Sequence, residues 1–221
     1  MAHITPLSRS ELPAFEMIFE SAERALGAVP NSMLTMGRKP GILGAFSLLA
    51  GSVFHSLNQP FSFKQIKFFR AFMSAAKKPD PENSITPQLQ QMVANVCSLS
   101  AGCRYCQAHT GEALHLMKVS DEKIQALLHY DTSDEFDDAE RAALGLAFAA
   151  ASVPNRSTPE HFAELRKHFN ENQIVELVAV IALFGFLNRW NDTMATALED
   201  APLNFARATL APAGWEAGKH G

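Results

Sequence analysis

The segment TPQLQQMVANVCSLSAGCRYCQAHT, residues 86–110, carries the clearest helix signals of the chain and all three of its cysteines. Thr86 followed by Pro87 is typical of a helix start, because threonine can cap free N–H groups and proline fits the first helical position. Leucine, methionine and valine then recur at the spacing of one helix face. Gly102 is expected to end this helix and Cys103 to begin the next. The segment therefore predicts two consecutive helices, with Cys103 and Cys106 near the point where they join.

Helix signals of the same kind recur along the whole chain, and no long stretch alternates with the period of a β-strand. Residues 30–32 read as a turn and residues 79–84 as a loop. The fold class expected is all-α, a helical bundle. Caps, glycines and prolines around apolar stripes predict helices near 10–27, 40–57, 63–77, 86–101, 103–117, 120–128, 139–151, from 158 onward, and 171–198.

Length and charge limit the classes of protein to which the chain can belong. Its 221 residues suit one domain, and a net charge of -4 without clustered lysine or arginine argues against nucleic acid or an anionic membrane as partner. The start of the chain does not resemble a secretory signal, and the longest apolar run, residues 177–187, is too short for a transmembrane helix. Three cysteines in this setting predict a reducing, cytoplasmic compartment.

A weak internal sequence similarity predicts that the single domain, residues 1–221, consists of two similar halves at 30–120 and 121–205. The short segments QMVA (91–94) and ELVA (176–179) both lie inside expected helices with clear caps. Any two buried helices could share such a match by composition, so one undivided domain is an equal alternative.

The chemistry of the chain is concentrated in Cys103, Cys106 and His109, which follow one another at intervals of three residues. A helix places such residues on one face, and its N-terminus favours thiolate over thiol. Only the thiolate attacks peroxides or disulfides, and a histidine within reach can act as general base. The pattern favours a redox dithiol. Half of a metal site and a pair of small core residues remain alternatives, although the core interpretation suits Cys97 better.

Four segments together resemble the alkyl hydroperoxidase D and carboxymuconolactone decarboxylase family. They are TPQLQQMVA at 86–94, GCRYCQAHT at 102–110, LNRWND at 187–192 and GWEAGKH at 214–220. The likeness covers most of the chain from about residue 29. It implies a helical bundle, often assembled as a dimer, trimer or hexamer, and peroxide reduction with disulfide exchange where the dithiol is present.

The resemblance also implies roles for individual residues. Cys106 would be the peroxidatic thiolate, Cys103 would resolve its sulfenic acid as a disulfide, and His109 would be the relay base. The helix dipole instead favours Cys103 as the thiol of lower pKa, so the order of the two stays open. Gln91 stands where the family usually has glutamate, His109 is three rather than four residues after the second cysteine, and Tyr105 replaces a histidine of some members. These departures predict a weaker or altered peroxidase.

The expected function is a thiol-dependent peroxidase or disulfide oxidoreductase that uses neither cofactor nor metal. Its partners would be a hydroperoxide substrate and an external dithiol or protein reductant. Two alternatives remain, a lactone decarboxylase of the other branch of the family and a non-enzymatic helical oligomer that senses oxidants through its cysteines. Apolar helix faces around Phe46, Phe54, Phe63 and Phe69 predict burial between subunits of a homo-oligomer.

Overall fold

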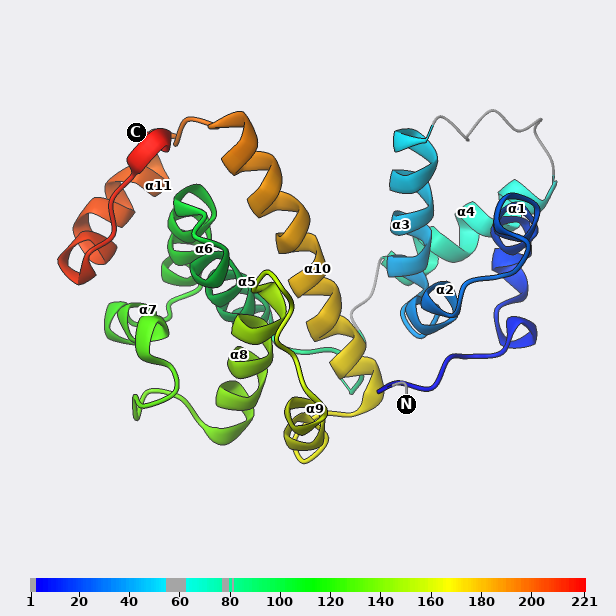
Figure 1. Cartoon of the computed structure of the whole chain (residues 1–221), viewed down its shortest axis with the longest axis horizontal. Helices are drawn as coiled ribbons and strands as arrows, with labels where there is room; N and C mark the ends of the chain where they lie inside the picture. The colour runs from blue at the N-terminus through cyan, green and yellow to red at the C-terminus, as the bar shows by residue number, and fades with distance from the viewer. Residues whose placement is uncertain (1–2, 55–62, 77–79, 81) are drawn as a thin grey trace. The chain divides into compact units, whose positions relative to one another are not determined.

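The computed structural model describes residues 3–54, 63–76, 80 and 82–221, and these form helices and no β-strand (Figure 1). The all-α prediction is therefore confirmed. The chain divides into two compact units, Met1–Ser84 and Ile85–Gly221. The single domain and its two similar halves stay predictions, and neither predicted half ends at the boundary between these units.

The first unit has a small aromatic core. The ring of Phe15 meets that of Phe68 edge-on, with centroids 5.6 Å apart. Gly44 lets α3 and α4 approach closely, because a Cβ at this position would lie 2.4 Å from the ring of Phe72. The core residues are Leu12, Phe15, Phe19, Met33, Leu43 and Phe68. The helices of the unit are α1 (Glu16–Leu26), α2 (Asn31–Met36), α3 (Pro40–Val53) and α4 (Phe63–Ala76), and short 3₁₀ turns cover Arg9–Glu11 and Pro13–Phe15.

Two predictions in this unit need correction. The first α-helix begins at Glu16 rather than near residue 10, because Pro13 has no N–H to donate and the chain before it forms 3₁₀ turns. The expected turn at 30–32 is instead the start of α2. The predicted end of α1 is confirmed, since Gly27 adopts a φ of 80°. The predicted ends of the next two helices fall on residues outside the described ranges.

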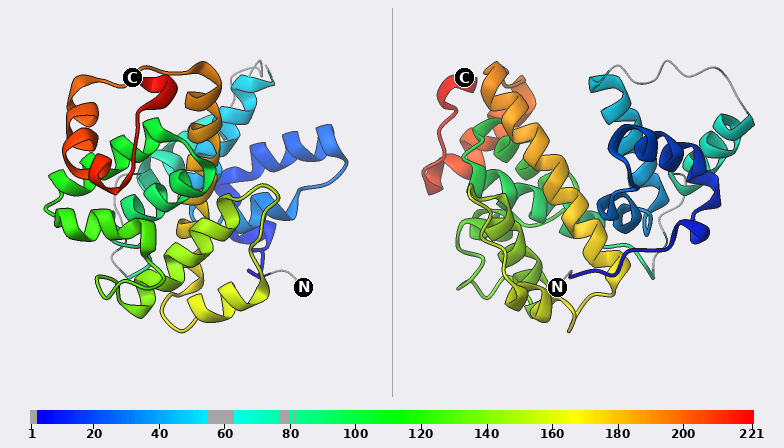
Figure 2. Two further views of the ribbon diagram at one scale, coloured as in Figure 1. Left: turned by 60° about the vertical axis from the view of Figure 1, so that its left-hand side comes forward. Right: turned by 45° about the vertical axis from the view of Figure 1, so that its right-hand side comes forward.

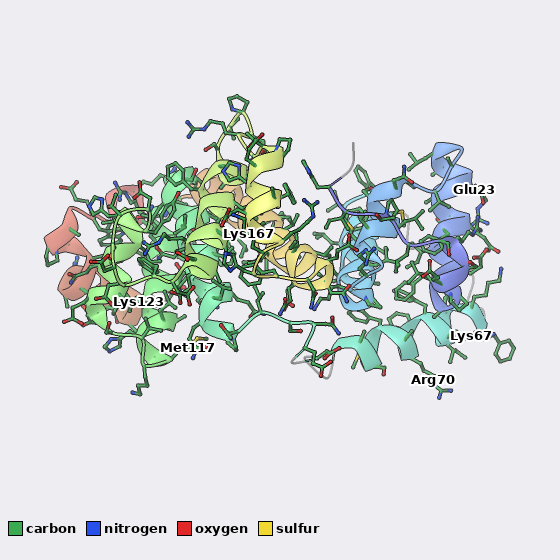
Figure 3. The ribbon with its side chains drawn as sticks, turned by 90° about the horizontal axis from the view of Figure 1, so that it is seen from below. Glu23, Lys67, Arg70, Met117, Lys123 and Lys167 are labelled. Carbon is green, nitrogen blue, oxygen red and sulfur yellow. The ribbon has the colours of Figure 1, made fainter. Side chains whose placement is uncertain are left out.

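The second unit is a bundle built around α5, which packs against α6, α8 and α10. These neighbours leave the segment from Met92 to Ser98 buried on all sides. Lys123, labelled in Figure 3, joins α7 to α8 through Glu140 at 2.8 Å. The helices are α5 (Pro87–Ala101), α6 (Arg104–Leu116), α7 (Asp121–Ala126), α8 (Asp138–Ala151), α9 (Pro159–Leu165), α10 (Glu171–Met194) and α11 (Asp200–Phe205), followed by a π-helical turn at Ala206–Leu210.

The predicted caps of this unit are present. The Thr86 hydroxyl accepts a hydrogen bond from the N–H of Leu89 at 3.2 Å, and Asn170 caps the start of α10. The prediction was wrong at the end of α10, which stops at Met194 rather than near residue 198. Ala195 there adopts a left-handed conformation with a φ of 49°, which a continuing helix does not allow.

By length and composition alone, α10 is the one helix of the described residues that could cross a membrane. Its buried Asn188 and Asn191 form hydrogen bonds with α5 and α6, as a helix of a bundle does. Its other face is apolar and exposed, and with α8 it forms an open groove of about 950 Å³ that includes Phe186 and Trp190.

The four phenylalanines predicted to lie between subunits belong to the first unit. Phe46, Phe54, Phe63 and Phe69 are between 40% and 84% exposed. The oligomer that would cover them stays a prediction.

Candidate functional site

The turn between α5 and α6 places both cysteines of the motif. Gly102 adopts a φ of 77°, which suits glycine, and the N–H of Cys103 donates to the carbonyl oxygen of Ser98 at 3.0 Å. Cys103 is then the N-cap residue of α6, and its Sγ accepts a hydrogen bond from the N–H of Cys106 at 3.5 Å. Both sulfurs therefore lie at the first turn of α6, close to the positive end of the helix dipole.

The two sulfurs share a hydrogen bond that separates their acidities. The Cys103 thiol donates to the Cys106 sulfur, and this lowers the pKa of Cys106 although burial opposes the change. Asn191 Nδ2, 3.5 Å from Cys106 Sγ, lowers it further. The same bond between the sulfurs, together with burial, raises the pKa of Cys103. These directions favour a thiolate at Cys106 over one at Cys103. Which of the two attacks the substrate stays a prediction.

The third cysteine has a structural role. Cys97 is fully buried in α5, and burial raises its pKa to about 12. Its neighbour Ser98 donates to Asn188 Oδ1 at 3.0 Å, which ties the end of α5 to α10. This agrees with the sequence interpretation of Cys97 as a core residue.

His109 belongs to an exposed cluster beside the cysteines. Its Nε2 lies 2.8 Å from Glu199 Oε2, and the hydroxyl of Tyr105 donates to Glu199 Oε1 at 3.0 Å. The rings of Tyr105 and His109 lie 4.4 Å apart. Within the described part of the chain, the ring of His109 has no hydrogen bond to either sulfur, so its role as the base of Cys106 stays a prediction. Burial and the bond to Glu199 raise the pKa of Tyr105 to about 12.

The two family relay positions hold residues that do not titrate. Gln91 lies half-buried in α5, about three turns before Gly102. Thr110, in the place of the family histidine, donates its hydroxyl proton to the carbonyl oxygen of Cys106 at 2.7 Å and accepts from Asn95 Nδ2 at 2.9 Å. Both positions can hold a hydrogen-bond network, but neither can take up a proton.

A second group of ionisable residues lies beside Cys103 and was missed by the sequence interpretation. A ring nitrogen of His220, a carboxylate oxygen of Asp192 and Cys103 Sγ lie within 4.8 Å of one another. Arg189, three residues before Asp192 on α10, donates to the carbonyl oxygen of Gly185 at 2.8 Å. Asp192 accepts its bonds from the C-terminal segment, which returns to α6 (Figure 2). The one sequence signal was the GWEAGKH segment at 214–220.

The donor atoms of Cys103, Asp192 and His220 are of the types that bind zinc. A tetrahedral protein site needs a fourth ligand, and Lys219 Nζ lies 3.7 Å from Asp192 Oδ1, where its charge would oppose a second cation. The group therefore suits proton transfer better than a structural zinc ion.

Residues 66–149 match the model of the carboxymuconolactone decarboxylase family. Among curated proteins, the uncharacterized protein YdfG of Bacillus subtilis (strain 168) is 27% identical over 121 residues, which are 54% of this chain and 80% of that protein. The matched residues 66–149 include Cys103, Cys106 and His109.

Solved structures extend the similarity to nearly the whole length. The debrominase Bmp8 is 36% identical, with 94% of this chain and 96% of that chain covered and a TM-score of 0.55. A variant of Bmp8 in complex with 2,3,4-tribromopyrrole is 34% identical, with coverages of 96% and 97% and the same TM-score. The alkylhydroperoxidase AhpD core, an uncharacterized peroxidase-related protein from Ralstonia eutropha JMP134, shares the fold, with 19% identity, coverages of 91% and 93% and a TM-score of 0.52.

Proposed function

The chain belongs to the carboxymuconolactone decarboxylase family, and from its site we propose a dithiol-dependent reductase of the alkyl hydroperoxidase D-like type. The observation that carries this proposal is the placement of both sulfurs at the first turn of α6, with Asn191 Nδ2 3.5 Å from Cys106 Sγ. It favours a thiolate at Cys106 and a protonated thiol at Cys103. A nucleophile next to a resolving thiol is the arrangement that two-electron reduction of an electrophile requires.

A hydroperoxide is the first substrate class. The Cys106 thiolate would attack the peroxide oxygen, cleave the O–O bond and become a sulfenic acid, while the leaving alkoxide takes a proton. Cys103 would then attack the Cys106 sulfur, form the disulfide and release water. The dithiol loses two electrons and the peroxide gains them, and an external dithiol or protein reductant restores both thiols. A reducing cytoplasm would supply such a reductant.

A halogenated aromatic compound is the second substrate class, favoured by the similarity to Bmp8 over nearly the whole chain. The same two thiols would supply two electrons to replace a carbon–bromine bond by a carbon–hydrogen bond. The new carbon–hydrogen bond would take the proton of the Cys103 thiol, bromide would leave, and the disulfide would form as before. Both classes therefore need the same thiolate and the same resolving cysteine, and they differ only in what enters the site.

The experiment offers each substrate class to the reduced protein under the same conditions. Hydrogen peroxide, an alkyl hydroperoxide and tribromopyrrole are added in separate reactions. The loss of thiols, the formation of the disulfide and the release of alcohol or bromide ion are then measured. The proposal expects a disulfide between Cys103 and Cys106 and many turnovers when a dithiol is added. Cys106→Ser should abolish turnover, and Cys97→Ser should retain it because that thiol is buried and structural.

The two earlier alternatives give different results in this assay. Decarboxylation of a carboxylated lactone by the Cys106→Ser variant would support the decarboxylase and overturn the thiol mechanism. A disulfide that forms once, changes the size of an oligomer and yields no turnover would support the oxidant sensor. Loss of one substrate class with retention of the other would assign the specificity.

A further inference from the structure

We propose that Asp192 and His220 form the proton-transfer site of the cysteine pair, with the C-terminal segment bringing an imidazole to Cys103. The inference rests on the proposed dithiol chemistry. In this proposal Asp192 and His220 carry out the proton transfer, because Gln91 and Thr110 at the family relay positions cannot take up a proton.

The hydrogen bonds of His220 define where its protons are. Its Nδ1 lies 2.8 Å from the carbonyl oxygen of Thr196, which has no proton to give, so Nδ1 must be the donor. Its Nε2 lies 3.0 Å from Asp192 Oδ1. A bare ring nitrogen and a carboxylate oxygen are both acceptors, so one proton must lie between them. The pair therefore holds one proton that it can give away and later take back.

The position of the pair is fixed by the fold. His220 is 1% exposed, and its carbonyl oxygen accepts from the N–H of Leu198 at 2.8 Å, which ties the C-terminal segment to the chain after α10. The ring of Tyr105 lies 5.9 Å from that of His220 and covers it from α6. An imidazole held on both nitrogens beside a reacting sulfur loses little freedom when it acts.

Cys103 needs such a partner more than Cys106 does. Its thiol keeps its proton because it donates to Cys106 and is buried, so it cannot attack until a base removes that proton. Asp192 and His220 each place an ionisable group within 4.8 Å of its sulfur. His109 is instead bonded to Glu199, with its Nε2 2.8 Å from Glu199 Oε2.

With this pair, every proton transferred in the peroxide reaction has a donor and an acceptor. The Cys106 thiolate attacks the peroxide, and the pair gives its proton to the leaving alkoxide. The emptied pair then takes the proton of Cys103, whose thiolate attacks the Cys106 sulfur and expels hydroxide. The pair gives this second proton to the hydroxide and water leaves. Reduction of the disulfide by an external dithiol returns one proton to the pair and one to Cys103.

A test independent of the natural substrate uses the disulfide 4,4′-dithiodipyridine. The Cys106 thiolate attacks it and expels a pyridinethiolate, which leaves without acid assistance and then takes the proton of the pair as thiopyridone. The emptied pair removes the proton of Cys103, whose thiolate attacks the mixed disulfide, and this proton goes to the second thiopyridone. The second phase measures proton removal from Cys103. In His220→Gln we expect the second phase to slow on the order of 10²-fold, the contribution typical of general acid–base catalysis, while the first phase changes little.

His115→Gln is the matched control. His115 lies on α6, the helix of Cys106, and also pairs with an aspartate, since its Nδ1 is 2.8 Å from Asp121 Oδ1. It is exposed and lies nine residues beyond Cys106, outside the motif. Both phases should match the unmodified protein. Asp192→Asn keeps the shape of the pair and removes its transferable proton, so its second phase should also slow. If His220→Gln does not fold, Asp192→Asn tests whether the pair removes the proton of Cys103.

Chemical rescue separates proton transfer from packing. Imidazole added to His220→Ala should restore the second phase in proportion to its concentration, which a purely structural role would not produce. The proposal is overturned if folded Asp192→Asn keeps an unchanged second phase, or if both phases slow equally. Failure of every peroxide and bromopyrrole to oxidise the unmodified protein would instead refute the proposed function and leave the two-phase assay intact.

Discussion

Replacement of Cys103 by alanine should raise the pKa of Cys106. The Cys103 thiol is the largest cause of the lowered pKa of Cys106, and alanine removes this donor. Burial of Cys106, which raises its pKa, then acts with less opposition. Asn191 Nδ2 at 3.5 Å remains as the second donor, so the shift should be partial.

The size of the shift follows from the energy of the lost bond. A hydrogen bond to a charged group contributes about 1.5–3 kcal/mol, and a thiol donor belongs at the lower end of that range. Because about 1.4 kcal/mol is a tenfold change in an equilibrium, the thiolate fraction of Cys106 at a pH below its pKa should fall roughly tenfold. Cys103→Ser keeps an O–H donor and should give a smaller change.

The assay is the rate of alkylation by iodoacetamide as a function of pH. A lower thiol pKa makes thiolate available at lower pH, so removal of the donor should move the midpoint of the rate profile to higher pH. Cys97 does not interfere, because it is fully buried and its pKa is about 12. Peptide mass spectrometry assigns the alkylated sulfur.

Two results would refute this reasoning. An unchanged midpoint in Cys103→Ala would mean that the sulfur–sulfur hydrogen bond does not set the acidity of Cys106. A low-pKa thiol that survives Cys106→Ala and disappears in Cys103→Ala would reverse the two roles, as the helix dipole alone had suggested.

Three further substitutions separate the site from the scaffold. Asn191→Leu removes the weaker donor to Cys106, so the midpoint of the same alkylation profile should rise by less than in Cys103→Ala. Gly102→Ala places a side chain at a φ of 77°, which should cost about 1–2 kcal/mol in the free energy of unfolding measured with urea. Leu144→Ala empties a fully buried position in α8 and should cost about 2–5 kcal/mol in the same measurement without moving the alkylation midpoint. A large shift of that midpoint in Leu144→Ala would show that the thiol pKa depends on global packing.

The sequence was sufficient to predict the helices whose ends depend on neighbouring residues. Thr86, Gly102 and Asn170 each cap or stop a helix through contacts within a few residues, and such contacts are visible in the sequence. The short helices α2 and α11 were missed because neither begins with a side-chain cap, whereas the equally short α7 is capped by Ser120. Tertiary packing rather than local pattern decides such segments.

The same distinction applies to the site. Cys103 and Cys106 were found because their spacing within one helical turn is a local property. Asp192 lies 89 residues and His220 117 residues beyond Cys103, and only the folded chain brings the three together. The order of acidity could not be predicted either, because it depends on which thiol donates and on an amide from α10.

The buried Cys97 gives the protein an internal reporter of opening. Its sulfur can react with a thiol reagent at neutral pH only when α5 separates transiently from its neighbours, because the native helix excludes both reagent and solvent. The labelling rate of Cys97, relative to that of an unstructured thiol, therefore gives the equilibrium constant for this local unfolding. A compound that binds only the folded second unit must slow the labelling, so one chain with three thiols reports redox chemistry at two of them and ligand binding at the third.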